Sequence, residues 1–525
     1  MADSPVPLTE DYEKDRQRHV RAFARRLDSA VDQLTWPDAA RLALRDERLR
    51  ALLRTAKERS PWHANRLRHI DPEQITGDDL TEIPTMTKAD LMENWDSIVT
   101  DPRLTLDLAT AHLRRIEESG PAYLLDHYHL VETSGTSGTR AVFAWDFPGW
   151  LEVRLADIRS FAWLTRHRGW AKENRWAYLM TSLPTRMSRA GRVTFEPPET
   201  YIELPVSLPL AETVERLNAF RPTFLLAYPS LLHQLAQAAD AGDLHIAPDA
   251  LGVAGEPLRP AVAAAIEASF DAPLIDYYAS SESGTMAHTH PGVEGLYLVE
   301  ENAVLEPVDA AYRPVPAGVR SDRVLLTNVI NQLLPLIRYE LDDEITLLDE
   351  PDPGPWTGRR MAGPDAGRGR LGHASFGYPG GVEIPVYTFR MALVDHEQEI
   401  AEYQVRQTPD GADIDVRAAN ATAPDTPDLE ALRRTVTELL RRPGLDEPRV
   451  TVRRVDHFPL SEHGKFKRFV PLAAGTAGTD EAATEAAGRD EAAQDAAGTG
   501  ETAADAAGTG ETAADAAGTG EAAPC

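Results

Sequence analysis

Apolar runs alternate with amphipathic segments between residues 210 and 280, and this alternation constrains the fold more than any other feature. The helix-like segments are AETVERLNAF, PSLLHQLAQAADAG and EPLRPAVAAAIEASF, and the apolar runs are FLLAY, ALGVAG and PLIDYYA. Strands and helices that alternate in this way form parallel sheets with helices on their faces. The sequence therefore predicts an α/β fold. Ligands should bind beyond the carboxyl ends of its strands, where residues 277–284 fall.

Composition divides the rest of the chain into regions. Residues 1–60 carry apolar positions at helical spacing among many charges, which predicts a helical lead-in to a large domain that ends at residue 370. A run rich in Pro, Gly and Arg at 351–372 predicts an exposed connection to a small α+β domain over 371–472. Residues 473–525 hold eleven acidic residues, one arginine and the repeat ETAADAAGTG, which predicts a disordered acidic tail.

Charge and cysteine content argue against several classes of protein. The formal net charge is −29. Since no Lys/Arg-rich patch with interleaved aromatics offsets this charge, we expect no nucleic-acid partner. The only cysteine is Cys525, which excludes disulfides and a cysteine nucleophile within the folded part and favours the cytoplasm. The chain has no run of 18 apolar residues and its first twenty residues lack an apolar core, so we expect neither a membrane span nor export.

A loop of small and hydroxylated residues, VETSGTSGTR at 131–140, predicts an anion-binding site. Gly135 and Gly138 let the backbone approach an anion closely, and Arg140 adds a fixed positive charge. The hydroxyl donors are Thr133, Ser134, Thr136, Ser137 and Thr139. Most Ser/Thr/Gly-rich stretches are solvated turns, but this one lies between two strand-like segments, YLLDHYHLVE and AVFAWDF, which favours a phosphate-binding loop.

Commoner motifs do not fit this chain. A Walker A loop needs Gly, four residues and then Gly-Lys-Ser/Thr, and this spacing does not occur. The segment GRGRLG at 367–372 satisfies the dinucleotide pattern GxGxxG, but it leads into Phe, Tyr, Pro and Gly rather than a helix, so we reject an oxidoreductase. The two histidines of HTH at 288–290 lack further ligands at a defined spacing, which argues against zinc.

Four further blocks follow the loop in the chain. They are AGEPLRP at 254–260, DYYASSES at 276–283, RYELDD at 338–343 and SEHGKFKRF at 461–469. Together with the lead-in SPWHANRLRHIDPEQITGDDLTEIPTMTKADLMENWDSIV, their order resembles the adenylate-forming superfamily, and within it the phenylacetate–CoA ligase-like branch. The resemblance implies an ATP-dependent ligase. In the first step a carboxylate attacks the α-phosphate of ATP, giving an acyl-adenylate and pyrophosphate; a thiol, usually coenzyme A, then captures the acyl group.

The resemblance also implies residue roles, with ATP and Mg²⁺ as cofactors and coenzyme A as co-substrate. Glu282, after Ser281, matches the family's magnesium carboxylate, and a hard cation suits such an oxygen ligand. Asp343 matches the aspartate that accepts hydrogen bonds from the ribose hydroxyls. Lys465 matches the lysine that stabilises the adenylation transition state. The segments that line the adenine are matched by Gly255, Glu256, Pro257, Asp276, Tyr277 and Tyr278.

One departure concerns the junction of the two domains. Gly369 and Arg370 match the family's Gly-Arg, which implies that Arg370 reaches the ribose, but Gly372 and His373 replace the expected hinge carboxylates. This change puts the rotation of the small mobile domain, and with it the thiolation step, in question. Two alternatives therefore stay open. One is an adenylating enzyme that delivers its acyl group to a carrier-protein thiol, an amine or another nitrogen nucleophile. The other is a catalytically silent nucleotide-binding relative.

The partner implied by the resemblance is a small-molecule carboxylic acid, aromatic rather than long-chain aliphatic, because the phenylacetate branch is the one resembled. A carrier protein is a further candidate partner. We expect the acid pocket to draw on residues between about 178 and 235, a stretch of mixed polar and apolar side chains. Arg186, Arg189 and His233 lie in this stretch, and the sequence assigns none of them a role.

Overall fold

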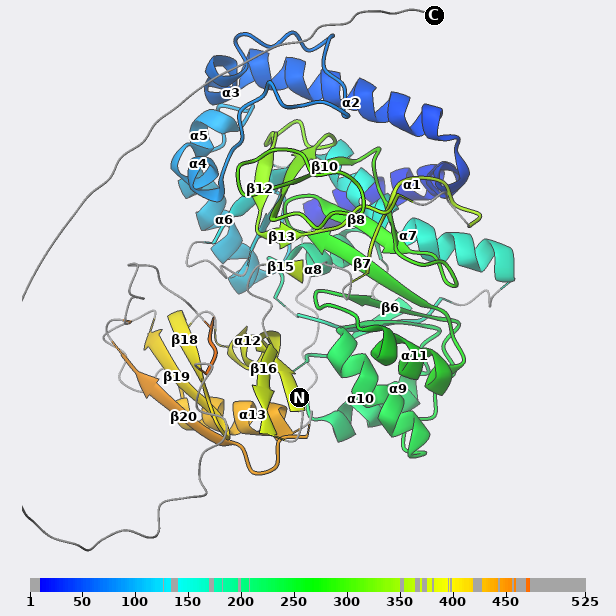
Figure 1. Cartoon of the computed structure of the whole chain (residues 1–525), viewed down its shortest axis with the longest axis vertical. Helices are drawn as coiled ribbons and strands as arrows, with labels where there is room; N and C mark the ends of the chain where they lie inside the picture. Colours follow the sequence, from blue (N-terminus) through cyan, green and yellow to red (C-terminus); the bar gives the residue numbers. More distant parts are fainter. Residues whose placement is uncertain are drawn as a thin grey trace, which may run out of the picture. The chain divides into compact units, whose positions relative to one another are not determined.

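The structure is a computed structural model that describes residues 10–472 with internal gaps (Figure 1). The gaps are 126, 134–139, 170–173, 182, 197–199, 207, 350–353, 364–368, 371–374, 380–381, 395, 397–398, 419–426, 442–443, 456–457 and 459–468. Several predictions fall outside the described residues: the centre of the anion-binding loop, the altered hinge positions Gly372 and His373, Lys465, and the acidic tail.

The largest sheet among the described residues has eight strands. Its strand order is β14-β9-β8-β7-β6-β5-β3-β4, and β7, β6, β5, β3 and β4 run parallel. The strands are β3 (Trp176–Leu179), β4 (Tyr201–Glu203), β5 (Phe224–Ala227), β6 (Ala250–Ala254), β7 (Leu274–Ser280), β8 (Gly284–Thr289), β9 (Leu296–Leu298) and β14 (Arg360–Met361). The predicted α/β fold with a largely parallel sheet is therefore confirmed, with antiparallel strands added on one side.

Helices cover both faces of this sheet. Figure 1 shows α9 (Leu210–Phe220), α10 (Pro229–Asp240) and α11 (Pro260–Phe270) gathered on one side and α7 (Phe147–Arg168) on the other. Because side chains alternate along a strand, neighbours in β3 enter different cores. Ala177 packs in the core of α9, α10 and α11, whereas Trp176 packs with Phe161 of α7. Burial on both faces explains why β3, β5 and β6 contain no charged residue.

The amino-terminal third is mainly helical. Its helices are α1 (Glu10–Asp32), η1 (Gln33–Thr35), α2 (Asp38–Arg59), α3 (Pro61–Arg66), α4 (Lys88–Glu93), α5 (Trp95–Ile98) and α6 (Leu106–Ser119). A short antiparallel pair, β1 (His129–Glu132) and β2 (Val142–Trp145), frames the predicted anion-binding loop, and α8 (Met187–Phe195) precedes β4. None of the helices in the described part of the chain is long and apolar enough to span a membrane.

Two further small sheets follow β9 in the chain. An antiparallel sheet contains β10 (Ala303–Val308), β11 (Arg323–Asn328) and β12 (Tyr339–Leu341). Directly after it, β13 (Asp343–Glu344) pairs antiparallel with β15 (Gly369–Arg370). This second pairing sets the backbone of Asp343 opposite that of Arg370, although the two residues lie apart in the sequence.

The carboxyl-terminal region has its own hydrophobic core. Its elements are β16 (Ser375–Tyr378), β17 (Val382–Pro385), α12 (Val386–Val394), β18 (Ile400–Thr408), β19 (Gly411–Ala418), α13 (Leu429–Arg441), β20 (Arg449–Arg454) and β21 (Phe469–Val470). The four-stranded sheet has the order β20-β19-β18-β21. Phe376, Phe389, Val405, Ile414 and Val436 are fully buried within this core. The region combines helices and strands, in keeping with the α+β pattern of its sequence.

Candidate active site

A cavity of about 330 Å³ opens at the carboxyl ends of β3, β5, β6 and β7. Residues that follow these strands line it, including Thr181, Tyr228, Gly255 and Ser281. The predicted site residues in its lining are Thr133, Gly255, Glu256, Pro257, Tyr277, Tyr278, Ser281, Glu282 and Asp343. They come from segments far apart in the sequence, and the fold brings them to one place. Within the described part of the chain, Asp276 and Arg140 lie outside this lining.

Glu282 lies in the turn between β7 and β8. The turn is tight because Gly284 has a φ of +73°, and a Cβ there would lie 2.7 Å from Val153 Cγ1. Asn328 Nδ2 donates to the backbone oxygen of Glu282 at 2.8 Å, which holds this turn in position. Glu282 is only 6% exposed, and its Oε2 has no hydrogen-bond partner among the described residues.

A buried carboxylate oxygen without a partner is costly, and a cation would satisfy it. Within the described residues, no group of three or more His, Cys, Asp or Glu side chains could hold a metal ion. Mg²⁺ commonly binds one or two carboxylates and completes its shell with substrate phosphates and water. The single carboxylate of Glu282, in the wall of a cavity, fits that kind of site.

Asp343 is held in the cavity wall by a tyrosine. It is buried, with 3% of its surface exposed, and Tyr278 Oη donates to its Oδ2 at 2.8 Å. The pairing of β13 with β15 fixes its backbone opposite Arg370, whose side chain is outside the described part of the structure. A carboxylate offers about four acceptor positions, so hydroxyl groups of a ligand can also donate to Asp343.

The segment after β6 approaches the cavity through a glycine. Gly255 has a φ of +83°, and a Cβ there would lie 2.8 Å from Tyr228 Cε1, so a larger residue would collide with that ring. Glu256 accepts hydrogen bonds from Ser230 N at 2.9 Å and Ser230 Oγ at 3.0 Å, in the first turn of α10. Burial raises the pKa of Glu256 to about 7. Through its two hydrogen bonds with Ser230, the carboxyl group of Glu256 also holds the first turn of α10 in position.

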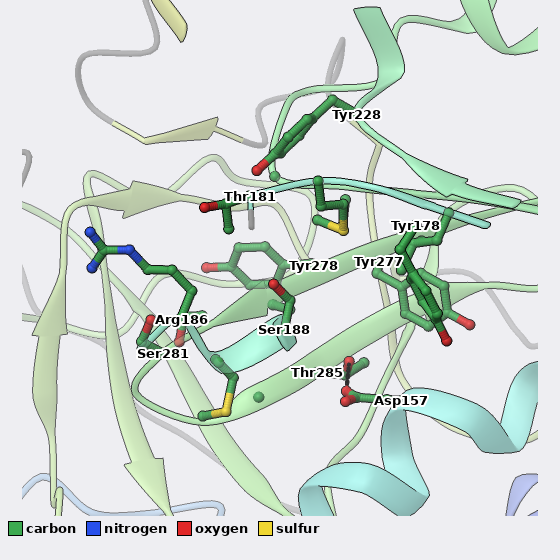
Figure 2. Close-up of a pocket in the computed structure, with 18 of the residues that line it drawn as sticks. Asp157, Tyr178, Thr181, Arg186, Ser188, Tyr228, Tyr277, Tyr278, Ser281 and Thr285 are labelled. Carbon is green, nitrogen blue, oxygen red and sulfur yellow. Dashed lines mark hydrogen bonds between the residues drawn. The ribbon is translucent and has the colours of Figure 1, made fainter. Parts of the chain in front are cut away.

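The structure separates three consecutive residues of β7 that the family resemblance groups around the adenine. Tyr278 lies in the middle of the cavity (Figure 2). Tyr277 lines another part of it, where its hydroxyl lies 2.6 Å from Ser160 Oγ of α7. Asp276 is buried outside the lining. Tyr277 and Tyr278 therefore border different parts of the cavity, whereas Asp276 does not border it.

Thr133 closes the base of the predicted anion-binding loop. Its backbone nitrogen donates to Ala141 O at 2.9 Å, and its Oγ1 accepts from Ala141 N at 2.9 Å. These two bonds join the ends of a loop whose centre, 134–139, is outside the described residues. Thr133 thus has a positioning role in addition to lining the cavity.

A buried glutamate gathers two arginines beside this loop. Glu132 Oε1 lies 3.2 Å from Arg140 Nη1 and 3.6 Å from Arg186 Nη1, and Arg186 also donates to the backbone oxygen of Glu132 at 3.0 Å. Arg186 lines the cavity, so a positive charge borders the site next to the loop. The sequence alone assigns no role to Arg186, because its position depends on contacts between β1 and the segment before α8.

The two other polar residues considered in the expected acid pocket lie elsewhere. Arg189 Nε donates to Glu203 Oε2 at 2.9 Å, and neither Arg189 nor His233 belongs to the described lining of the cavity. Arg189 therefore forms an ion pair with Glu203 of β4. Within 178–235, the side chains that do line the cavity include Tyr178, Met180 and Tyr228.

The far end of the cavity is aromatic and charged. Phe161 and Trp176 lie edge to face, with ring centroids 4.9 Å apart, and Tyr178 stacks on Trp176 at 5.6 Å. Arg154 and Asp157 of α7 also line the cavity. Figure 2 shows Arg186 and Ser281 on one side of Tyr278, and Tyr178, Tyr277, Thr285 and Asp157 on the other. The cavity therefore has two chemically different ends.

Comparisons with known proteins show the fold. No family model and no curated protein matches the chain. A structure of 2-hydroxyisobutyryl-CoA ligase in the postadenylation state, in complex with 2-HIB-AMP, matches with a TM-score of 0.52 and 19% identity, over 84% of this chain and 91% of that chain. A structure of the same ligase with 2-HIB-AMP and CoA in the thioesterification state matches with a TM-score of 0.53 and 20% identity, again over 84% of this chain and 91% of that chain. At this identity the likeness extends to the fold alone.

Proposed function

We propose that this protein uses ATP to activate a carboxylic acid as an acyl-adenylate, releases pyrophosphate, and transfers the acyl group to coenzyme A. One observation carries the proposal. A single cavity is lined by Thr133, the segment 255–257, Glu282 and Asp343, together with an aromatic end. Groups suited to a phosphate chain, a ribose and an organic acid are therefore contiguous. The fold shared with 2-hydroxyisobutyryl-CoA ligase supports the same reaction.

Each group has a chemical task in the proposed reaction. Charge accumulates on the phosphates during the transfer, and Mg²⁺ would supply the Lewis acid that stabilises it. Glu282 would hold the cation through its buried carboxylate. Donors of the loop over 133–140 would bind the phosphates, and Asp343, oriented by Tyr278, would accept hydrogen bonds from the ribose.

The remaining roles rest on the sequence resemblance. Lys465 would stabilise the adenylation transition state, and Arg370 would contact the ribose. Residues 255–257 and Tyr278 would border the adenine, and Ser281 would lie beside the phosphates. Arg186 joins this set, because it lines the cavity next to the loop and carries a positive charge.

An aromatic acid is the substrate class that we propose. Trp176, Phe161, Tyr178 and Ile158 offer apolar surfaces that suit a ring. The resemblance to the phenylacetate–CoA ligase-like branch points to the same class. The chain holds a single cysteine, Cys525, and we propose the cytoplasm as its compartment.

Pyrophosphate release tests the proposal. Purified protein is incubated with ATP and Mg²⁺ and a panel of aryl and alkyl acids, each with and without coenzyme A. We expect release that depends on the acid, and a thioester that accumulates only with coenzyme A. Release that coenzyme A does not stimulate would contradict the proposed acceptor and favour a carrier-protein thiol or a nitrogen nucleophile. No release with any acid would contradict adenylation and favour a silent nucleotide-binding relative.

A further inference from the structure

The aromatic end of the cavity contains a carboxylate with an unused acceptor position. Asp157 lies on α7 and accepts a hydrogen bond from Thr285 Oγ1 of β8 at 2.7 Å. Its Oδ2 lies 3.9 Å from Arg154 Nη1, which is too long for a hydrogen bond. The side chain of Asp157 is 30% exposed and lines the cavity. A ligand in the cavity can therefore contact it.

The arginine beside Asp157 is committed to a different carboxylate. Arg154 forms an ion pair with Glu196, which also accepts a hydrogen bond from Tyr178 Oη at 2.7 Å. Asp157 is therefore left with one hydroxyl donor and a distant positive charge among the described residues. Burial raises the pKa of Asp157, which reflects this incomplete compensation. A carboxylate can accept about four hydrogen bonds, so a ligand can supply what the protein does not.

The position of Asp157 separates it from the nucleotide-facing groups. In Figure 2 it lies beside Thr285, on the opposite side of Tyr278 from Arg186 and Ser281. The rings of Phe161 and Trp176 line the same cavity and pack against each other near the start of β3. A ligand group that reaches Asp157 would therefore be attached to the ring of the acid, at a distance from its carboxylate.

We propose that the acid carries a hydroxyl or amino group on its aromatic ring, and that this group donates a hydrogen bond to Asp157. The inference rests on the proposed function and narrows its substrate class. A ring with an apolar substituent of the same size would place a methyl group against the carboxylate of Asp157. A ring with a second carboxylate would bring two like charges together.

Isosteric substrate pairs test this inference. Amino, hydroxyl and methyl groups have similar size, so kcat/KM for adenylation is compared among aminobenzoates, hydroxybenzoates and methylbenzoates, and among the corresponding phenylacetates, at each ring position. We expect at least one ring position at which the amino- or hydroxyl-substituted acid is preferred over the methyl-substituted acid by about ten- to a hundredfold, as for a hydrogen bond to a charged group. The preference should arise mainly in KM, because the contact is remote from the reacting carboxylate.

Asp157→Asn should reduce this preference about tenfold or more while the unsubstituted acid is still adenylated. Asp107→Asn, at an exposed aspartate on α6, is the matched control and should keep the wild-type preference. The wild-type ratios need no variant, so they decide the question even if Asp157→Asn does not fold. Adenylation of aromatic acids without a preference for an amino or a hydroxyl group at any ring position would overturn the inference and leave the proposed function standing. Absence of adenylation with every acid would overturn both.

Discussion

Glu282 is the residue whose environment most directly demands a ligand. Its turn is held by Asn328 and by the close approach of Gly284 to Val153, so the carboxylate stays in the cavity wall. The block DYYASSES identifies this residue in the sequence, but its burial and its unpartnered oxygen are not predictable from that block. Both depend on packing against β11, which lies further along the chain.

Glu282→Gln should weaken the binding of the Mg²⁺ that the proposed adenylation requires. The amide keeps the shape of the side chain but loses the charge that a hard cation requires. We expect the Mg²⁺ concentration for half-maximal pyrophosphate exchange to rise at least about tenfold. Glu82→Gln, at an exposed glutamate, is the control. An unchanged Mg²⁺ titration in Glu282→Gln would contradict the assignment of this carboxylate.

Glu256 should make the stability of the protein depend on pH. Burial raises its pKa from 4.5 to about 7, so the folded state binds the proton more tightly than the unfolded state. The stability contributed by the protonated carboxyl group is fully present below pH 4.5 and is lost as the pH rises through 7. Glu256→Gln should remove this loss, because its amide stays neutral.

The measurement is the free energy of unfolding of Glu256→Gln and of wild type, from denaturant titrations between about pH 5 and pH 8. We expect the free energy of unfolding of wild type to fall relative to that of Glu256→Gln as the pH rises, by an amount on the order of 2 kcal/mol. The comparison of the two proteins cancels the titration of other groups. A difference that stays constant over this range would contradict the raised pKa.

Individual elements are predictable to different degrees. The strands β5, β6 and β7 and the helices between them follow from the alternation in 210–280, because each segment carries a local period. Within EPLRPAVAAAIEASF, α11 begins only at Pro260, since proline suits the first turn of a helix and the residues before it form the turn after β6. The antiparallel strands β8, β9 and β14 are not predictable in this way, because their pairing depends on distant partners.

The contribution of α7 to the cavity is the main feature that the sequence does not reveal. The expected acid pocket over 178–235 does supply Tyr178 and Tyr228 to the lining, but Asp157 and Phe161 come from α7. That helix is buried on several sides, so its periodicity does not show which face borders a ligand. Only contacts between α7 and its neighbours, such as Thr285 with Asp157, identify that face.

The strand pair β1–β2 is proposed to position the loop between its strands, and substitutions of Thr133 test this role. Thr133→Ala removes the hydroxyl that accepts from Ala141 N, whereas Thr133→Ser retains it. We expect the alanine variant to raise KM for ATP about tenfold, because the loop would lose one of the two bonds that join its ends. The serine variant should remain within about twofold of wild type. Equal KM values for the two variants would show that the hydroxyl does not position the loop.

The whole molecule contains an α/β domain that carries the cavity and a carboxyl-terminal region with a separate core. The domain boundary at residue 370 and the acidic tail stay predictions from composition. Besides the centre of the phosphate-binding loop at 134–139, Lys465 and the hinge positions Gly372 and His373 also lie outside the described residues. Their roles depend on the sequence resemblance, because short motifs do not determine where a segment lies in the folded chain. The most direct measurement therefore uses the whole protein and tests all parts of the proposed site together.

A crystal structure with a non-hydrolysable acyl-adenylate mimic, such as an aminobenzoyl sulfamoyl adenosine, would test the proposed site most directly. We predict that the ribose hydroxyls donate to Asp343, that the adenine lies beside Gly255 and Tyr278, and that the aryl group lies at the aromatic end with its amino group at Asp157. A mimic bound outside this cavity, or bound with its two ends exchanged, would contradict the proposed function of the cavity.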